Sequence, residues 1–338
     1  MIVNLPEELL IKILDYNNST QDLANYRLVC SCWNRLAEPL LFAKQITIKS
    51  EAGALSLFGH LYRNPDNGKI IKHLEFGRSY ISTVILKELL RLAFTPNMEY
   101  LTGSIGSDEL YMLMNNIADK TPDKFTRLKA IPSPEFFSNM YNSSLLTFKE
   151  TLQDITFILE DDDDDESDHW DIINQLETFK NLTKLKLDGR FPALFDVENV
   201  LKGCIYLTEL IMSTKFLDII HPKSEMEAWT PTNVKIVENV KKVTITLECR
   251  SDLLEYLTFK YPKIEAINID ASLPIALARN NLLRTLNVIK KARSINVKFP
   301  VKEGDLADTL KYLIADGTRF IVKDTADNNF GIVITETL

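Results

Sequence analysis

The chain has 338 residues, of which 45% are hydrophobic and 25% charged, a composition typical of folded proteins rather than disordered ones. Its formal net charge is −8, from 39 basic and 47 acidic residues, which does not indicate a nucleic-acid-binding surface. No apolar run reaches the roughly 18 residues of a membrane-spanning helix, and the N-terminus lacks the basic and apolar regions of a secretory signal. The four cysteines have no metal-ligand spacing. We therefore expect a cytoplasmic or nuclear protein with no membrane or nucleic-acid partner.

The first 42 residues predict three short helices. Pro6 suits a first helical turn, because its missing N–H has no partner there. Four apolar residues follow at helical spacing and predict one broad apolar face: Leu9, Leu10, Ile13 and Leu14. Ser19 or Thr20 can cap a second helix, and a third is predicted over roughly residues 27 to 37, ending before Pro39. About 40 residues are too few for a self-sufficient core, so this module should rest on a partner or on the following domain.

This segment resembles an F-box, the three-helix module that docks a protein onto the Skp-family adaptor of a cullin ubiquitin ligase. The resemblance rests on the spacing of Leu5-Pro6, Asp22-Leu23, Val29-Cys30, Trp33 and Leu40-Leu41-Phe42. It implies an F-box over residues 1–45, with adaptor contacts at or beside five residues: Leu5, Pro6, Val29, Cys30 and Trp33. Some of these side chains can equally well pack inside the module, and the sequence alone does not separate the two arrangements.

A short apolar phrase recurs through the rest of the chain, in which apolar residues are separated first by two residues and then by one. The middle positions of its first four copies lie 27 residues apart, at Leu74, Leu101, Leu128 and Ile155. Five further copies are centred on Leu185, Leu210, Val243, Ile267 and Ile295. Helix-like stretches lie between the copies, at residues 84–92, 171–179, 197–203 and 251–259.

The phrase resembles a leucine-rich repeat, in which each copy supplies a short strand. The resemblance implies an α/β fold in which the F-box is followed, over residues 46–338, by a curved leucine-rich-repeat solenoid with a parallel sheet on its inner face. Residues 46–48 should supply a first strand, and a terminal hairpin is expected at about 318–336, turning at Asp327-Asn328-Asn329. The Asn or Cys usual in such repeats is absent, which predicts an irregular solenoid. Other residues stand at its position: Ser79, Gly106, Ser133 and Arg190.

Strand alternation predicts which side chains face a target on the inner surface of such a sheet. Five of them are candidate substrate-binding residues, four forming a cationic area: Tyr100, Arg127, Lys129, Lys184 and Lys186. The alternative is that they are ordinary solvated residues on an exposed face. An acidic run at about 160–168 supplies eight negative charges and is expected to be a loop, because like charges repel. It is either a solvated insertion or a segment that competes with an acidic target or recruits a basic one.

No catalytic, cofactor-binding or metal-binding residue is predicted. The four histidines are scattered, and the chain has no phosphate-binding loop and no nucleophile motif. The resemblance thus implies a non-catalytic substrate receptor that holds the Skp-family adaptor, a cullin through it, and an unknown protein substrate. One alternative is an F-box protein that works with the adaptor outside a ligase. Another is a metal-dependent or hydrolytic enzyme on a repeat scaffold, which the absence of motifs disfavours.

Overall fold

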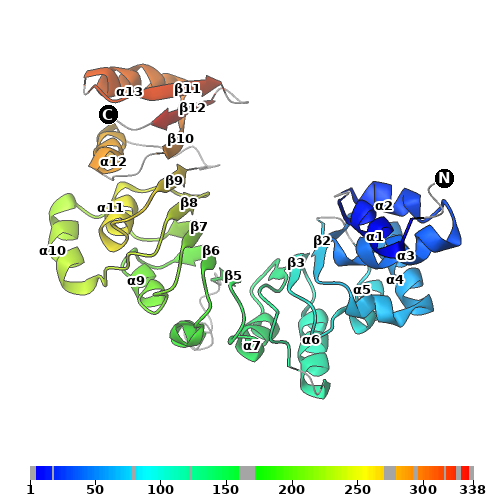
Figure 1. Ribbon diagram of the computed structural model, residues 1–338. Helices are drawn as coiled ribbons and strands as arrows, with labels where there is room; N and C mark the ends of the chain where they lie inside the picture. Colours follow the sequence, from blue (N-terminus) through cyan, green and yellow to red (C-terminus); the bar gives the residue numbers. More distant parts are fainter. Residues whose placement is uncertain are drawn as a thin grey trace. The chain divides into compact units, whose positions relative to one another are not determined.

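The computed structural model describes residues 5–16, 19–77, 81–121, 124–159, 172–269, 279–291, 296–315, 317–324 and 329–334. The chain divides into two compact units, Met1–Leu152 and Gln153–Leu338. Each unit combines helices with a largely parallel sheet (Figure 1). Among the described residues, no helix combines the length and the apolar character needed to cross a membrane.

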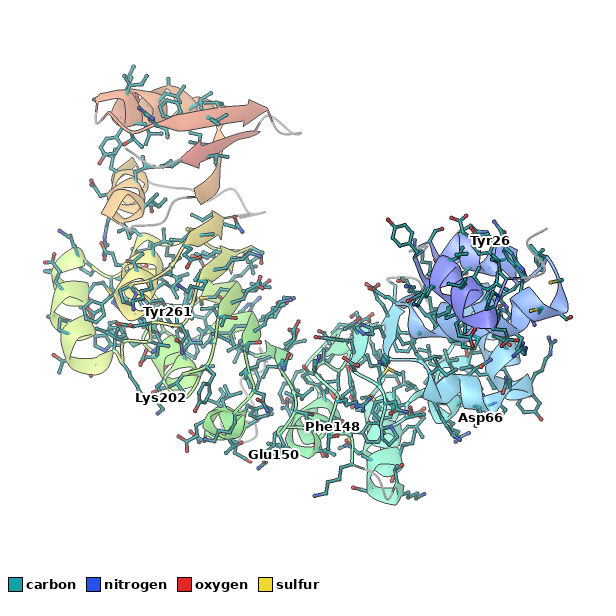
Figure 2. All side chains as sticks on the ribbon, in the orientation of Figure 1. Tyr26, Asp66, Phe148, Glu150, Lys202 and Tyr261 are labelled. Atoms are coloured by element: carbon teal, nitrogen blue, oxygen red, sulfur yellow. The ribbon has the colours of Figure 1, made fainter. Side chains whose placement is uncertain are left out.

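The first unit begins with three helices, α1 (Glu7–Tyr16), α2 (Thr20–Tyr26) and α3 (Ser31–Ala43). Ser19 caps α2 by accepting a hydrogen bond from the Asp22 N–H, at 3.2 Å. The three helices enclose a small core of Leu10, Leu14, Leu23, Leu36 and Ala37. Aromatic residues complete it at its edge, and Tyr26 lies within this bundle in Figure 2.

The expected limits of the third helix are wrong, since α3 begins at Ser31 and continues through Pro39 to Ala43. A proline within a helix removes one hydrogen bond to the carbonyl four residues earlier. Here α3 buries Leu36 and Ala37 before the proline and Phe42 after it. Packing of both sides of the proline into the unit therefore outweighs the lost hydrogen bond.

A four-stranded sheet and four further helices complete the first unit. Its elements are β1 (Ile46–Ile48), α4 (Glu51–Arg63), a 3-10 helix (Pro65–Lys69), β2 (His73–Phe76), α5 (Thr83–Ala93), β3 (Tyr100–Ile105), α6 (Asp108–Lys120), β4 (Ser133–Pro134) and α7 (Asn139–Thr147). The strands run in parallel in the order β1-β2-β3-β4. Ile46 pairs with Leu74, and Leu74 pairs with Leu101. Residues 46–48 thus supply the first strand, as the sequence predicts, and join the three-helix module to the sheet.

The third copy of the apolar phrase, centred on Leu128, differs from the expectation. Leu128 is buried but lies outside any strand, and a single bridge joins Tyr100 to Ala130. β4 follows and has only two residues. Pro132 and Pro134 have no N–H to donate to a ladder, so the strand stops there. The expected single sheet is therefore replaced by two sheets, and the second begins at β5.

The second unit is built on an eight-stranded sheet in the order β11-β12-β10-β9-β8-β7-β6-β5. Its strands are β5 (Asp154–Ile158), β6 (Lys184–Phe191), β7 (Glu209–Phe216), β8 (Lys242–Ile245), β9 (Ala266–Ile269), β10 (Asn296–Lys302), β11 (Phe320–Asp324) and β12 (Asn329–Ile334). Its helices are α9 (Asp196–Leu201), α10 (Lys223–Asn233), α11 (Ser251–Lys260), α12 (Arg279–Lys291) and α13 (Glu303–Ala315), with a 3-10 helix at Leu176–Thr178. Within the helix expected at 171–179, residues 172–173 are helical and the 3-10 helix Leu176–Thr178 follows after a turn, so the described part is not one continuous helix.

The apolar phrase sets the register of this sheet from β5 to β9. The predicted middle residues lie side by side: Ile155, Leu185, Leu210, Val243 and Ile267. At the next strand the register differs, because Val297 rather than Ile295 pairs with Ile267. The terminal hairpin is present, with β11 antiparallel to β12. Parts of several predictions lie outside the described residues: Ser79, the acidic run 160–168, Ile295, and Asp327 and Asn328 of the hairpin turn.

Helices α9 to α12 lie on one side of the parallel strands of the second unit (Figure 1). Burial along β7 alternates strictly, so one face of the strand is buried and the other is half-exposed. Tyr261, which follows α11, is buried in the layer of packed side chains (Figure 2). The sheet thus offers one face to the helices and leaves polar side chains on the other.

Candidate functional site

Solvent-exposed apolar side chains are concentrated in the three-helix module. They are Leu5, Leu9, Ile11, Ile13, Tyr16, Leu28 and Val29. Along α1, the buried residues are Leu10 and Leu14, whereas Leu9 and Ile13 are 46% and 56% exposed. The predicted broad apolar face of this helix is therefore divided into a buried stripe and an exposed one. Leu5, Leu9 and Ile13 follow one another at intervals of four residues, which places the helical pair on one side of α1.

A second exposed pair lies between α2 and α3. Leu28 and Val29 are 84% and 62% exposed, while their backbone N–H groups bond to the carbonyls of Asn25 and Tyr26, at 3.0 and 3.1 Å. Arg27 holds the turn against α3, because its guanidinium donates to Asn34 at 3.0 Å and to Glu38 at 2.9 Å. The turn is thus fixed by polar contacts while its apolar side chains remain in solvent.

Trp33 has a mixed environment. Its ring meets the Tyr26 ring edge-on, with centroids 5.4 Å apart and an interplanar angle of 77°. It packs against the core of the module but is only partly buried. Trp33 therefore supports the module from its edge and still presents surface to a partner.

The other predicted adaptor-binding residues are all exposed. Leu5 is 37% exposed, and Pro6, which precedes α1, accepts hydrogen bonds at its carbonyl from the N–H groups of Leu9 and Leu10. Cys30 is a free, exposed thiol at the start of α3. The sequence argument missed Leu9, Ile13 and Leu28 as surface residues. Their apolar character gave no way to tell an exposed stripe from a core stripe on so small a module.

Two ion pairs tie α1 to α3 at the rim of this surface. Glu7 pairs with Arg35, and Asp15 pairs with Lys44 at 3.4 Å. The hydrogen bond that the exposed Arg35 guanidinium donates to the Glu7 carboxylate raises the pKa of Arg35 above its ordinary value. The surface therefore combines apolar side chains with charges of both signs at its edge.

The candidate substrate-binding residues of the first unit lie together in part. The Tyr100 ring lies 4.9 Å from the ring of His73 on the neighbouring strand, and the Lys129 ammonium lies 5.1 Å from the centre of the Tyr100 ring. Lys129 also pairs with Glu99 at 3.3 Å, and this bond together with the Tyr100 ring raises the pKa of Lys129. Arg127 is exposed and lies outside any strand.

The candidate lysines of the second unit lie on β6 and are both paired. Lys184 pairs with Asp154 on β5 at 3.0 Å, and Lys186 pairs with Asp188 at 2.5 Å. These lysines and Lys129 each face a carboxylate, so much of the charge of the expected cationic area is neutralised. The structure brings Tyr100 to Lys129 and Lys184 to Lys186, and the two pairs belong to different units.

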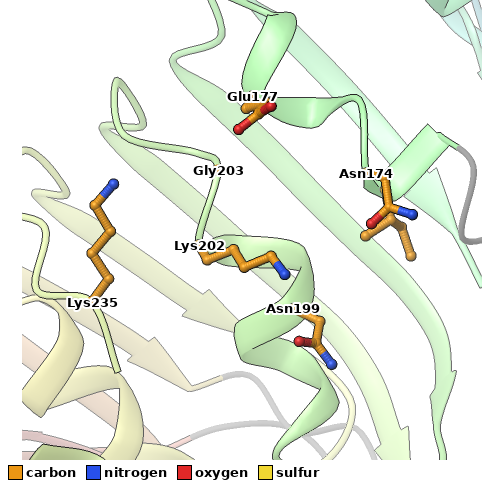
Figure 3. Close-up of a pocket in the computed structure, with 7 residues that line it drawn as sticks. Asn174, Glu177, Asn199, Lys202, Gly203 and Lys235 are labelled. Atoms are coloured by element: carbon orange, nitrogen blue, oxygen red, sulfur yellow. The ribbon is translucent and has the colours of Figure 1, made fainter. Parts of the chain in front are cut away.

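An open pocket lies on the helical side of the second unit, with a cavity volume of about 450 Å³ (Figure 3). Its lining is Ile173, Asn174, Glu177, Asn199, Lys202, Gly203 and Lys235. Gly203 lies close to the neighbouring segment: a Cβ there would lie 3.1 Å from the Glu177 backbone nitrogen, so a larger residue needs a small local shift. The lining offers lysine ammonium and amide groups together with one carboxylate. It contains no cysteine, serine or histidine that would act as a nucleophile or base.

Comparison with known families identifies the N-terminal module. A family described as F-box-like matches residues 2–48 of the chain. Among curated proteins, none matches this chain. Residues 2–48, with their exposed apolar stripe and fixed turn, are an F-box-like domain.

Proposed function

We propose that this protein is the substrate-recognition subunit of a Skp–cullin–F-box ubiquitin ligase. In this function the F-box-like domain docks the Skp-family adaptor, and the following repeats, which we propose form an irregular leucine-rich-repeat-like solenoid, hold a protein target. The contribution is positional, because bringing target lysines close to an activated ubiquitin raises their effective concentration. No residue of this chain needs to carry catalysis. The four free cysteines fit a cytoplasmic or nuclear location.

The observation that carries the proposal is the F-box-like domain with its solvent-exposed apolar side chains. Contiguous exposed apolar surface on a small domain is characteristic of a protein-binding site. Here it lies on Leu5, Leu9 and Ile13 along α1 and on the Leu28–Val29 turn. The solenoid part is supported by the five consecutive strands that share one apolar register.

The first test is binding of a purified Skp-family adaptor to the full chain, measured by isothermal titration calorimetry. We expect a stoichiometric complex with the wild type. The double substitution Leu28→Glu/Val29→Glu should weaken binding by roughly tenfold or more, because it places charges at an apolar contact. The fold should be preserved, since both side chains are exposed at 84% and 62%.

The matched control is Leu55→Glu, on the exposed side of α4 at 51% exposure. It should bind the adaptor like the wild type. Unchanged binding by the Leu28→Glu/Val29→Glu variant, with a circular dichroism spectrum identical to that of the wild type, contradicts a contact at this turn. Failure of the wild type to bind any Skp-family adaptor contradicts the proposal as a whole.

Membership of a ligase is a separate question from adaptor binding. Copurification of the tagged chain from cells with both adaptor and cullin supports the ligase. Adaptor without cullin supports the alternative, in which the protein works with the adaptor outside a ligase.

A further inference from the structure

The loop that joins β7 to α10 in the second unit, residues 217–222, has an unusual combination of anchoring and exposure. Leu217 is 69%, Ile219 81% and Ile220 39% exposed. The backbone and polar groups of the same loop are held by hydrogen bonds to several other parts of the unit, described below. We call residues Leu217–His221 the anchored loop.

Arg250 is the main anchor. Its side chain is 2% exposed, and its guanidinium makes five hydrogen bonds. To the loop it donates to the Asp218 carbonyl at 3.0 Å, the Asp218 carboxylate at 2.6 Å and the Ile219 carbonyl at 2.7 Å. To Asp252, which is fully buried, it donates twice, at 3.0 and 2.6 Å. A guanidinium has five N–H donors, so this contact set matches its whole donor capacity.

Other polar groups of the anchored loop are also bonded. The Leu217 N–H donates to the Phe191 carbonyl at 3.0 Å, which extends the β6–β7 ladder by one residue. His221 donates its N–H to Asp252 at 2.8 Å, and its ring nitrogen lies 2.8 Å from the Asp218 carboxylate. The His221 carbonyl accepts from Arg284 of α12 at 2.6 Å. The path of the loop is thus fixed by groups from β6, from the segment before α11, from α11 itself and from α12.

This arrangement costs folding free energy, and a binding function of the exposed side chains accounts for that cost. Burying a charged guanidinium carries a desolvation penalty that its partners must offset. Leaving three large apolar side chains in water forgoes the stabilisation that their burial would give. A loop whose path is fixed in advance loses little conformational entropy on binding. Together these features indicate a preformed docking element rather than a connection between a strand and a helix.

The charges beside the anchored loop indicate the kind of partner. Arg190 and Lys215 are directly paired in register on β6 and β7, and alternation places Leu217 on the same sheet face as Lys215. Among the described residues, Lys215 has no carboxylate partner. Two acidic side chains of neighbouring segments are engaged elsewhere: Glu248 accepts the Phe216 N–H at 3.0 Å, and Asp218 is held by Arg250. On this sheet face the exposed Leu217 is therefore bordered by the Lys215 ammonium.

We propose that the anchored loop is a docking site for a protein segment in which large apolar side chains are flanked by acidic ones. The apolar side chains of the partner cover Leu217, Ile219 and Ile220, and its carboxylates face Lys215. This inference builds on the proposed receptor function and names the class of target surface that the repeats recognise.

The test is selection of random peptides displayed on phage against the immobilised full chain. We expect the selected peptides to share at least two large apolar residues flanked by Asp or Glu. Their binding to the Leu217→Glu/Ile219→Glu variant should be weaker by roughly tenfold or more. The control is Ile236→Glu, at 53% exposure elsewhere in the same unit, and it should bind the peptides like the wild type. Synthetic versions with lysine in place of the acidic residues should lose binding.

Three outcomes overturn the inference: no enrichment, enriched peptides that bind the Leu217→Glu/Ile219→Glu variant unchanged, and peptides that bind equally well with lysine in place of the acids. A dimer of the wild type that this variant abolishes, seen by light scattering without peptide, also overturns it in favour of self-association. Adaptor binding is measured on the same preparations. Peptide selection without adaptor binding removes the ligase proposal and leaves the docking loop, whereas adaptor binding without peptide selection does the reverse.

Discussion

At the scale of single residues, Arg250 shows how a buried charge can serve local geometry. The guanidinium lies between two carboxylates, Asp218 and Asp252, and also over the Phe216 ring, 5.0 Å from its centre. The hydrogen bonds to both aspartates outweigh the effect of burial, so the pKa of Arg250 is raised above its ordinary value. The side chain is thus charged and its donors are all bonded, so it holds Asp218 and Ile219 of the loop in place.

Replacing Arg250 by alanine should destabilise the protein by about 3–5 kcal/mol, because it leaves Asp252 buried without its cation. The measurement is the free energy of unfolding from urea denaturation. The control is Lys263→Ala, since Lys263 pairs with Glu238 at 2.5 Å but both side chains are more than half exposed. Exposed pairs of this kind contribute about 1 kcal/mol or less. Equal effects of the two substitutions would show that the Arg250 contacts do not stabilise the fold.

The Asp218 carboxylate, in the same loop, predicts that the protein loses stability at acid pH. Burial raises the pKa of this carboxyl, but hydrogen bonds from the Leu194 N–H, Arg250 and His221 outweigh it, and the pKa lies below the ordinary 3.8. Asp196 also faces it and is affected in turn, since burial and the Asp218 charge raise the pKa of Asp196.

An acid whose pKa is lowered by folding contributes stability that is fully present above its ordinary pKa and is lost as the pH falls through the folded-state value. Unfolding free energies of the wild type should therefore fall below about pH 4, and those of Asp218→Asn should fall less steeply. Glu227→Gln, which removes a carboxylate that is 66% exposed, serves as the control. If Asp218→Asn loses unfolding free energy with falling pH as steeply as the wild type, Asp218 does not make this contribution.

At the scale of elements, glycine decides where two strands can approach. Gly103 in β3 pairs with Phe76 and has φ of +112°, and a Cβ there would lie 2.2 Å from the Phe76 carbonyl oxygen. Gly189 in β6 has the same kind of backbone conformation, with φ of +116°. A Cβ there would lie 2.4 Å from the Leu159 carbonyl oxygen. Both positions combine a left-handed conformation with backbone contact, which excludes larger residues.

Gly103→Ala should lower the free energy of unfolding by about 1–3 kcal/mol, because alanine disfavours this backbone conformation and clashes with β2. Gly59→Ala, in the interior of α4, adds a methyl group that meets no neighbouring atom within 4 Å, so it should instead raise the free energy of unfolding. The expected gain is about 0.5–1 kcal/mol, because alanine favours the helix over glycine by that amount. Thermal and urea unfolding of the two variants measure the difference. Effects of the same sign would contradict the role assigned to Gly103.

The helices and strands also show where sequence patterns lose information. The apolar phrase predicted the register from Ile155 to Ile267 because each strand there buries alternate residues against helices on one side. At Leu128 the same phrase supplies a buried residue without a strand. Burial requires only an apolar side chain, whereas a ladder requires N–H donors that Pro132 and Pro134 lack. These prolines were visible in the sequence and are the signal that would have located the break.

At the scale of the whole molecule, residue spacing and the resemblance to an F-box together predicted a helical module followed by alternating strands and helices. The sequence did not predict which side of the module is exposed, because apolar residues at helical intervals fit a buried stripe and an exposed stripe equally well. Leu10 and Leu14 became core while Leu9 and Ile13 did not, and tertiary packing on α3 made that choice. Likewise, Lys184 and Lys186 were visible as cations, but their pairing with Asp154 and Asp188 depends on strand register and rotamers.

The anchored loop was not predicted at all. Arg250, Asp218 and Asp252 are separated by up to 34 positions, and nothing in their spacing marks them as one network. Leu217, Ile219 and Ile220 in turn look like a continuation of the preceding apolar strand. Only the three-dimensional contacts separate the side chains that hold this loop from those that it displays.

That separation has a consequence for how the surface of this loop changes over evolution. The contacts that set the loop's path involve backbone groups, Asp218 and His221, whereas the side chains of residues 217, 219 and 220 project into solvent. Substitutions at these three positions alter what is displayed without disturbing what supports it. Three codons are therefore enough to change the surface that this loop displays while its scaffold stays unchanged.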